Sequence, residues 1–391
     1  MKYNWESIKT IFCDFRGLIS IGVTDIVGTG IAALFWFYMA SILGPESYGK
    51  VSYLISIASL TSTISLIGST NMLTVYTAKN VKIESTVYFI SIICGLLASS
   101  ILYFFIHDVI ATIFVIGLML TSLGNATIIG KKLYKNYSKY IIVQKLLMIS
   151  LSMSMYYTIG FEGILIGITL SSTPYLIIIY KGFRESKIDF RLIKDRFAFM
   201  SNSYVLNLSS GFTGSIDKLI IVPLLGLGIL GNYQLGIQFL AVLQILPSIV
   251  YKYILPQDAS GNPNRNLKKV IIIISAIFTF CGIVLSPFII PKLFPKYENA
   301  VQVFQIISLS LVPDTITTIY QSKYFGNEKV KIVLIGSIIH VSIQITSILL
   351  LGKFFGANGV ATSLVLCSLA SCIFYLVTSR FFETRGKSIL S

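Results

Sequence analysis

Charged side chains are scarce in this chain of 391 residues. They make up 12% of it, where a soluble protein carries about 25%, while 54% is hydrophobic and the mean hydropathy is +0.81. So much apolar surface cannot be hidden in the core of a water-soluble domain. The sequence therefore indicates an integral membrane protein. The basic start MKYNWESIK leads into a run long enough to span, so we expect the first span to act as its own signal.

Residues that build metal and nucleotide sites are also few. The five cysteines lie in or beside apolar runs and form no metal-spaced pair, so we interpret them as packing residues. The nearest approach to a nucleotide-binding loop is GNATIIGKK (124–132). It has one residue too many between its glycines and lacks Ser or Thr after the lysine. No loop is long enough to form a catalytic domain. We therefore expect a protein that is not an enzyme and has no cofactor.

Twelve apolar runs are long enough to cross a bilayer, for which roughly 20 residues are needed. Basic residues alternate strongly between the loops, with 25 Lys and Arg on the side of the N-terminus and 4 on the other. Because cytoplasmic loops are enriched in Lys and Arg, both termini are predicted to be cytoplasmic. Topology thus explains the net charge of +15, which does not indicate nucleic-acid binding. The predicted spans are 18–42, 51–75, 86–106, 108–130, 140–159, 163–180, 199–225, 229–255, 269–290, 300–322, 330–351 and 357–379.

The longest polar loop, KGFRESKIDFRLIKDRF, follows the sixth predicted span and divides the chain in two. We predict an N-terminal six-helix lobe (1–180), a basic cytoplasmic linker (181–197) and a C-terminal six-helix lobe (198–391). The break LGPESYG (43–49) has a counterpart 182 residues later, LGLGILG (225–231), and each lies between the first two spans of its half. Halves that start on the same side are parallel repeats about an axis along the membrane normal. This architecture is typical of transporters that alternate between inward-open and outward-open states.

Polar side chains in the predicted spans gather on the first, second, seventh and eighth. Helical periodicity places them on one face of each span. Small hydroxyl residues can also serve only to pack helices tightly, and that alternative stays open. Stripes on equivalent spans of the two halves favour a hydrated central cavity. Its candidate lining includes Asn202, Gln234 and Gln238.

Ionisable residues inside spans are costly and usually functional. Asp25 is a candidate cation or proton site, or else an inner-leaflet acid paired with Arg16 or Lys218. Asp217 and Lys218 are adjacent, so their side chains point about 100° apart and are not expected to pair face to face. Lys218 is the candidate contact for an anionic substrate, with a structural ion pair as the alternative. Lys145 comes second, because it is expected to extend to the cytoplasmic interface.

Two further residues are candidates for coupling transport to an ion gradient. Asp314 follows Pro313 in the tenth predicted span, where a proline frees backbone carbonyls. His340 lies near the middle of the eleventh and can titrate near neutral pH. A hydrogen-bonded histidine inside the bundle is the alternative for His340. Together with Asp25, these residues predict proton or sodium coupling.

A family resemblance rests on two stretches. GTGIAALFWFYMASILGPESYGKVSYLISIASLTSTISLIGS (28–69) resembles the start of the O-antigen and polysaccharide flippases, and SIDKLIIVPLLGLGILGNYQLGIQF (215–239) resembles their seventh and eighth helices. These flippases belong to the multidrug/oligosaccharidyl-lipid/polysaccharide exporter (MOP) superfamily. The resemblance implies an all-α, MATE-like pair of six-helix lobes, with spans one, two, seven and eight lining the cavity.

The resemblance also implies a substrate. Family members move polyprenyl-pyrophosphate-linked oligosaccharide across the cytoplasmic membrane for cell-surface glycan synthesis. This chain departs from the family in having no Arg deep in a span. Lys218, and after it Lys145, would then contact the pyrophosphate, while Asn, Gln and Ser side chains suit sugar hydroxyls. The implied partners are the lipid-linked oligosaccharide, membrane lipids, a polysaccharide polymerase and glycosyltransferases; nucleic acid is not among them.

Other functions remain open from the sequence. The deep acids Asp25 and Asp217 suit an ion-coupled antiporter of drugs or organic cations, whereas Lys218 argues against it. A lipid II-type flippase would more usually have fourteen helices. A glycosyl polymerase or ligase would need a large outer loop, which this chain lacks, and a structural scaffold would not need polar stripes.

Overall fold

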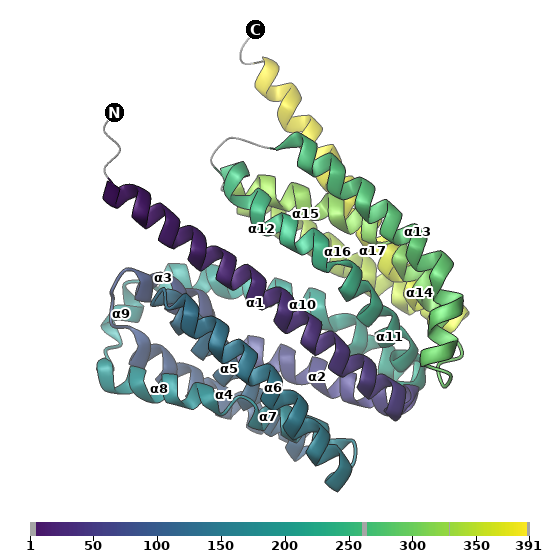
Figure 1. Ribbon diagram of the computed structural model, residues 1–391, viewed down its shortest axis with the longest axis horizontal. Coiled ribbons are helices and arrows are strands. Elements are labelled where there is room, and N and C mark those ends of the chain that lie inside the picture. Colours follow the sequence, from purple (N-terminus) through teal and green to yellow (C-terminus); the bar gives the residue numbers. More distant parts are fainter. Residues whose placement is uncertain (1–4, 260–263, 328, 389–391) are drawn as a thin grey trace. The chain divides into compact units, whose positions relative to one another are not determined.

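The computed structural model describes residues 5–259, 264–327 and 329–388, and within these ranges the chain forms helices and no strands (Figure 1). The helices of the first half are α1 (Trp5–Leu43), α2 (Pro45–Leu66), α3 (Ser69–Ala78), α4 (Glu84–Ile106), α5 (Val109–Gly130), α6 (Tyr134–Ile159), α7 (Glu162–Leu170), α8 (Pro174–Glu185) and α9 (Arg191–Lys194). Those of the second half are α10 (Phe197–Leu225), α11 (Leu227–Leu243), α12 (Ile245–Ala259), α13 (Arg265–Leu293), α14 (Ala300–Ser308), α15 (Leu311–Gly326), α16 (Val330–Ser347), the π-helix η1 (Ile348–Gly352) and α17 (Lys353–Ser388).

Many of these helices are long and apolar enough to cross a membrane. Among the described residues nine qualify, or eleven when the bent pairs α2–α3 and α11–α12 each count as one span. The bends measure 51° and 46°. An all-α, multi-pass membrane fold is thus confirmed, while the count of twelve and the side of the termini remain predictions.

One continuous stretch explains why the count falls short of twelve. Val330–Arg380 counts as a single candidate span of 51 residues. At 1.5 Å per residue such a helix would be about 77 Å long, more than twice the hydrocarbon thickness of about 30 Å. Gly356 interrupts it with φ 55° and ψ −130°, values outside the helical region. The predicted eleventh and twelfth spans lie on either side of this break.

The chain packs as two compact units. Unit 1 comprises Met1–Phe35 and Leu54–Gly211, and unit 2 comprises Trp36–Tyr53 and Phe212–Ser391. The end of α1 and the start of α2 are therefore part of unit 2, and the first half of α10 is part of unit 1. The predicted linker at 181–197 separates the two halves of the sequence repeat. The two units are instead groups of residues that pack together, so their boundaries differ from it.

The matched glycine breaks meet inside unit 2. Gly44 and Gly226 both have positive φ, 77° and 89°, which glycine adopts at little cost. A Cβ atom on Gly231 would overlap the carbonyl oxygen of Pro45, and one on Gly49 would overlap that of Leu227. The two breaks thus pack backbone to backbone, which only glycine allows at these positions.

Unit 1 is held together by buried aromatic and hydroxyl groups. Tyr88 of α4 is fully buried and hydrogen-bonds Thr127 of α5 at 2.6 Å. Ser85, beside the start of α4, donates to the backbone oxygen of Ser186 at 2.8 Å, just after α8. Tyr175 of α8 is also fully buried and packs against Gly124 of α5. The first two contacts fix the beginning of α4 against α5 and the end of α8, and the third packs the start of α8 against α5.

Candidate functional site

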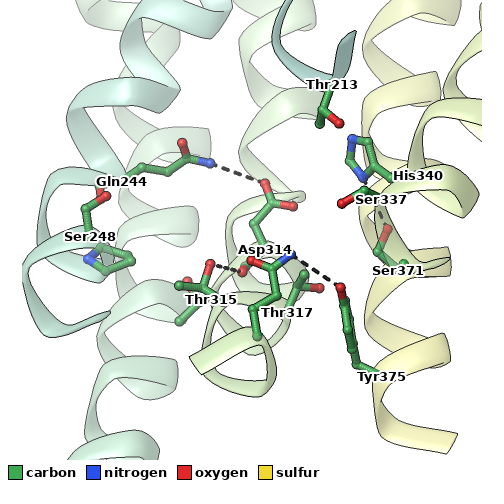
Figure 2. Close-up of a pocket in the computed structure, with 14 residues that line it drawn as sticks. Thr213, Gln244, Ser248, Asp314, Thr315, Thr317, Ser337, His340, Ser371 and Tyr375 are labelled. Atoms are coloured by element: carbon green, nitrogen blue, oxygen red, sulfur yellow. Dashed lines mark hydrogen bonds between the residues drawn. The ribbon is translucent and has the colours of Figure 1, made fainter. Parts of the chain in front are cut away.

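The polar cavity that contains most of the predicted coupling residues lies in unit 2. Its volume is about 250 Å³, and five helices line it: α10, α12, α15, α16 and α17 (Figure 2). The lining is rich in hydroxyl groups and holds one carboxylate and one imidazole. Its residues are Thr213, Gln244, Pro247, Ser248, Asp314, Thr315, Thr317, Thr318, Gln321, Gly336, Ser337, His340, Ser371 and Tyr375.

Asp314 supplies the carboxylate from the first turn of α15. The chain turns between α14 and α15, and Pro313 falls in that first turn, where its missing N–H needs no helical acceptor. The Gln244 side-chain amide donates to Asp314 Oδ2 at 3.2 Å, from the break between α11 and α12 (Figure 2). Among the described residues no Lys or Arg lines the cavity, so Asp314 faces it without a neutralising base from this part of the chain.

His340 lies on α16 with both ring nitrogens next to α17. Nδ1 is 3.2 Å from the Ser371 hydroxyl, and Nε2 is 3.4 Å from the Cys367 thiol (Figure 2). A Tyr375 hydroxyl further along α17 is 3.5 Å from the amide nitrogen of Gln321. This geometry is that of a hydrogen-bonded histidine inside the helix bundle, in the wall of a cavity that Asp314 also lines.

Asp217 and Lys218 of α10 pair directly, contrary to the sequence-based expectation. Lys218 Nζ lies 3.1 Å from Asp217 Oδ1, and it also donates to the carbonyl oxygen of Gly214 at 3.1 Å. The expectation was wrong because it considered only the directions in which the two side chains leave the helix. The flexible four-carbon chain of lysine bends back along its own helix and reaches the neighbouring carboxylate. The Tyr233 hydroxyl of α11 donates to Asp217 Oδ2 at 2.9 Å, so this buried carboxylate is well satisfied.

The predicted amide residues have different surroundings. Gln234, on α11 in unit 2, has a buried Oε1 without a hydrogen-bond partner, and Gln238 is half-buried one turn later. Asn202 of α10 is exposed in unit 1. Asn207, five residues further on, makes the polar contacts instead, accepting from Asn71 at 3.3 Å and donating to the neighbouring Thr70 at 3.1 Å.

Asp25 and Lys145 belong to unit 1. The Tyr137 hydroxyl of α6 donates to Asp25 Oδ1 at 2.9 Å, a partner that the sequence analysis did not consider. Lys145 is half-buried on α6 and packs near Gly28 of α1. Because α6 begins at Tyr134, Lys145 stands closer to the middle of its helix than predicted. Its ammonium makes no hydrogen bond or ion pair with any residue that the structure describes.

Two of the predicted residues, Asp314 and His340, line the same cavity in unit 2, and the Cys367 thiol contacts His340. Gln244 could have been suspected, since it comes just before Pro247 at the end of an apolar run. Tyr233 left no sequence signal, because its role depends on which helix faces it. No group of three His, Cys, Asp or Glu side chains is arranged for a metal ion among the described residues.

Comparison with solved structures identifies the class of fold. An inward-facing multidrug resistance MATE family transporter of the MOP superfamily is similar with a TM-score of 0.67 and 15% identity, over 93% of this chain and 96% of that one. The outward-facing conformation of a MATE family transporter has a TM-score of 0.65 and 15% identity to this chain, over 95% of this chain and 96% of that one. A third structure is a MOP superfamily transporter from Pyrococcus furiosus, whose binding pocket is described as having reverse polarity that suggests a different function. Its TM-score is 0.60 and its identity 14%, over 94% of this chain and 96% of that one. The chain thus has the MATE transporter fold.

A family comparison narrows this class. Residues 15–129 match the model described as polysaccharide biosynthesis protein. No curated protein sequence matches the chain. The matched segment contains the first of the two stretches on which the resemblance was based, 28–69, while the second, 215–239, lies outside it. This match bears out the expected resemblance to polysaccharide biosynthesis proteins over residues 15–129, in a chain with the apolar helices of a multi-pass membrane protein.

Proposed function

We propose that this transporter moves polyprenyl-pyrophosphate-linked oligosaccharide between the leaflets of the cytoplasmic membrane, for synthesis of a surface polysaccharide. The observation that carries the proposal is the match of residues 15–129 to the polysaccharide biosynthesis family, in a chain with a transporter fold. A polymerase and glycosyltransferases acting on the same glycan are the proposed partners. The charges and polar groups of the two units support the same substrate.

The geometry favours Lys145 over Lys218 as the contact for the pyrophosphate. Lys218 is neutralised by Asp217 and donates to the carbonyl oxygen of Gly214. Binding an anion there would require breaking a buried ion pair, which costs several kcal/mol. Lys145 is half-buried and has no partner among the described residues, so its charge is available. A half-buried ammonium without a counter-ion is itself unfavourable, and an anionic substrate would relieve that cost.

The cavity of unit 2 suits ion coupling. Asp314 is a carboxylate in a small polar cavity whose walls offer hydroxyl oxygens and a nearby imidazole. Such a carboxylate can exchange a proton or hold a sodium ion. At about 250 Å³ the cavity is too small for an oligosaccharide. We therefore assign Asp314 and His340 to coupling rather than to the glycan.

Transport in proteoliposomes tests the proposal. A fluorescent polyprenyl-pyrophosphate oligosaccharide is incorporated into both leaflets, and its accessibility to an external quencher is followed over time. We expect the wild-type protein to exchange it between the leaflets and Lys145→Met to slow exchange by about tenfold or more, the loss of one charge-assisted contact. Lys139→Met is the matched control, because Lys139 is an exposed lysine of the same helix. Absence of exchange by the wild type, with the protein folded, would reject the proposal.

One observation favours a second function, antiport of organic cations. Asp314 faces its cavity without a neutralising base, which suits a cationic ligand as well as a coupling ion. Uptake of a fluorescent organic cation against a proton or sodium gradient, in the same proteoliposomes, separates the two functions. Cation uptake that disappears in Asp314→Asn, together with no movement of the lipid-linked oligosaccharide, would establish the antiporter.

A further inference from the structure

A second and larger cavity lies in unit 1, where four helix ends come together. Its volume is about 480 Å³. It lies between the end of α3, the start of α4 and the ends of α5 and α8. Its lining residues are Thr77, Ala78, Asn80, Val81, Lys82, Glu84, Gly130, Lys131, Lys132 and Glu185.

The level of this cavity is set by the apolar spans that end at it. One candidate span begins at Glu84, a second ends at Gly130, and a third ends at Glu185. The ends of such spans mark the boundary between hydrocarbon and lipid headgroups. The cavity therefore lies at headgroup level, where ligands can arrive from the bilayer as well as from water.

Two lysines at the rim are accessible to an anion, and one of them, Lys82, also interacts electrostatically with Glu185. Lys82 and Lys132 are exposed, and neither is in an ion pair among the described residues. Lys132 has φ 57°, in the left-handed region, two residues after the end of α5. The third lysine, Lys131, is neutralised within the protein. It forms an ion pair with Glu185, and its Nζ lies 3.7 Å from Glu84 Oε1.

The floor of the cavity holds two buried oxygens that lack a protein partner. Glu84 is 5% exposed and its Oε2 accepts no hydrogen bond, and Thr77 is 7% exposed with an unpaired Oγ1. Buried oxygens of this kind are costly unless a donor reaches them. Both residues line the cavity, so a ligand inside it would meet acceptors at the floor and ammonium groups at the rim.

We propose that this cavity binds the headgroup of an anionic phospholipid that also carries hydroxyl groups, phosphatidylglycerol being the simplest. Three lysines and two glutamates line it, which leaves one positive charge for one phosphodiester. The phosphate lies against Lys82 and Lys132, and the glycerol hydroxyls donate to Glu84 and Thr77. Phosphatidylethanolamine has no net charge to offset the lysines, and phosphatidylcholine has neither net charge nor a donor for the buried oxygens. Basic pockets between membrane helices are known to bind anionic headgroups.

The test compares lipids and lysine pairs. The purified full-length protein is titrated in detergent with short-chain phosphatidylglycerol, phosphatidylserine, phosphatidylethanolamine or phosphatidylcholine, and binding is followed by native mass spectrometry and by the thermal unfolding midpoint. We expect phosphatidylglycerol to bind best and Lys82→Ala/Lys132→Ala to weaken it by about 10- to 30-fold, since each lysine contributes roughly a three- to sixfold step. Lys135→Ala/Lys139→Ala, two exposed lysines outside the cavity, is the matched control and should leave binding unchanged.

Thr77→Val separates a binding role from a structural one. Its hydroxyl has no protein partner, so the variant should fold and keep its unfolding midpoint in phosphatidylcholine. We expect it to lose part of the extra stabilisation that phosphatidylglycerol produces. Equal binding of all four lipids, or equal loss in both lysine pairs, would overturn the proposal. Binding of free glycerol phosphate with the affinity of the lipid would show that the ligand is a soluble phosphate instead. None of these results depends on whether oligosaccharide is transported.

Discussion

The two units treat buried charge in opposite ways. In unit 2, the buried acids Asp217 and Asp258 each pair with a lysine and with a hydroxyl group. In unit 1, Lys82 and Lys132 at the cavity rim and Lys145 on α6 form no ion pair among the described residues, and Asp25 accepts a hydrogen bond from Tyr137. Unit 2 thus neutralises its buried acids internally, whereas unit 1 leaves positive charge available.

This difference assigns different tasks to the units. A lysine already paired with a buried acid contributes little attraction for an anion, since the pair is neutral as a whole. Lysines without an acid partner attract phosphates and pyrophosphates, so we propose that anionic ligands bind to unit 1. Asp314 of unit 2 is the exception that has no base, and it is the acid best suited to exchange a cation or a proton. Substitutions that remove one partner at a time test this contrast.

The largest effect is expected from Asp217→Asn in unit 2. The change removes the counter-charge of Lys218, whose side chain is 12% exposed, and weakens the contact with Tyr233. Removing one partner of a buried pair costs about 3–5 kcal/mol, because the other charge stays buried. The free energy of unfolding in mixed detergent micelles measures this loss. Asp217→Asn/Lys218→Met should recover most of it, and a double variant as unstable as the single one would show that the pair is not what stabilises α10.

A smaller loss is expected from Asp258→Asn, at the other acid pair of unit 2. Lys268 donates to both carboxylate oxygens of Asp258, at 2.6 and 2.8 Å, and Ser322 donates to Oδ2 at 2.8 Å. The pair joins α12, α13 and α15, but Lys268 is more exposed than Lys218, so water compensates part of the loss. We expect about 2–3 kcal/mol, measured in the same way. Lys269→Met, which removes the exposed neighbouring lysine, should change the unfolding free energy by less than about 0.5 kcal/mol.

Hydropathy predicted where helices lie but not where they break. Every predicted span overlaps a helix of the structure, and α4 begins within two residues of its predicted start. The bend between α2 and α3 was missed, although Gly68 marks it with φ 76°, and so was the turn between α14 and α15. These breaks lie inside apolar runs. Hydropathy averaged over about 20 residues does not detect two or three residues that leave the helical conformation.

The candidate site was predictable in its residue types and not in its partners. Asp217, Asp314 and His340 stood out because ionisable groups are rare in spans, and the structure groups them in unit 2. Asp25 and Lys145 stood out for the same reason, but they belong to unit 1. Side-chain conformations and the packing of different helices decide which lysine has an acid partner. The spacing of residues along the sequence predicts neither of them.

A modest effect is expected from Tyr137→Phe in unit 1. The change removes the hydroxyl that donates to Asp25 at 2.9 Å and leaves the ring in place. A hydrogen bond to a charged group contributes about 1.5–3 kcal/mol, and the partial exposure of Asp25 reduces the expected loss to about 1–2 kcal/mol. Tyr140→Phe on the same helix is the control. If Asp25 couples transport to an ion, Tyr137→Phe should also change the dependence of transport on pH or sodium, while an unchanged dependence would restrict Tyr137 to a structural role.

The smallest effect on stability, and the most informative contrast, is expected from Lys145→Met in unit 1. Methionine keeps the length and apolar stem of lysine and removes a half-buried charge that has no partner among the described residues. The free energy of unfolding should stay the same or rise by about 1 kcal/mol, whereas Lys218→Met should lower it, because Asp217 is then left unpaired. Transport of the lipid-linked oligosaccharide should show the reverse order, with Lys145→Met the slower of the two. A destabilised Lys145→Met variant would mean that Lys145 supports the fold, and the division of anion binding and charge neutralisation between the units would then be wrong.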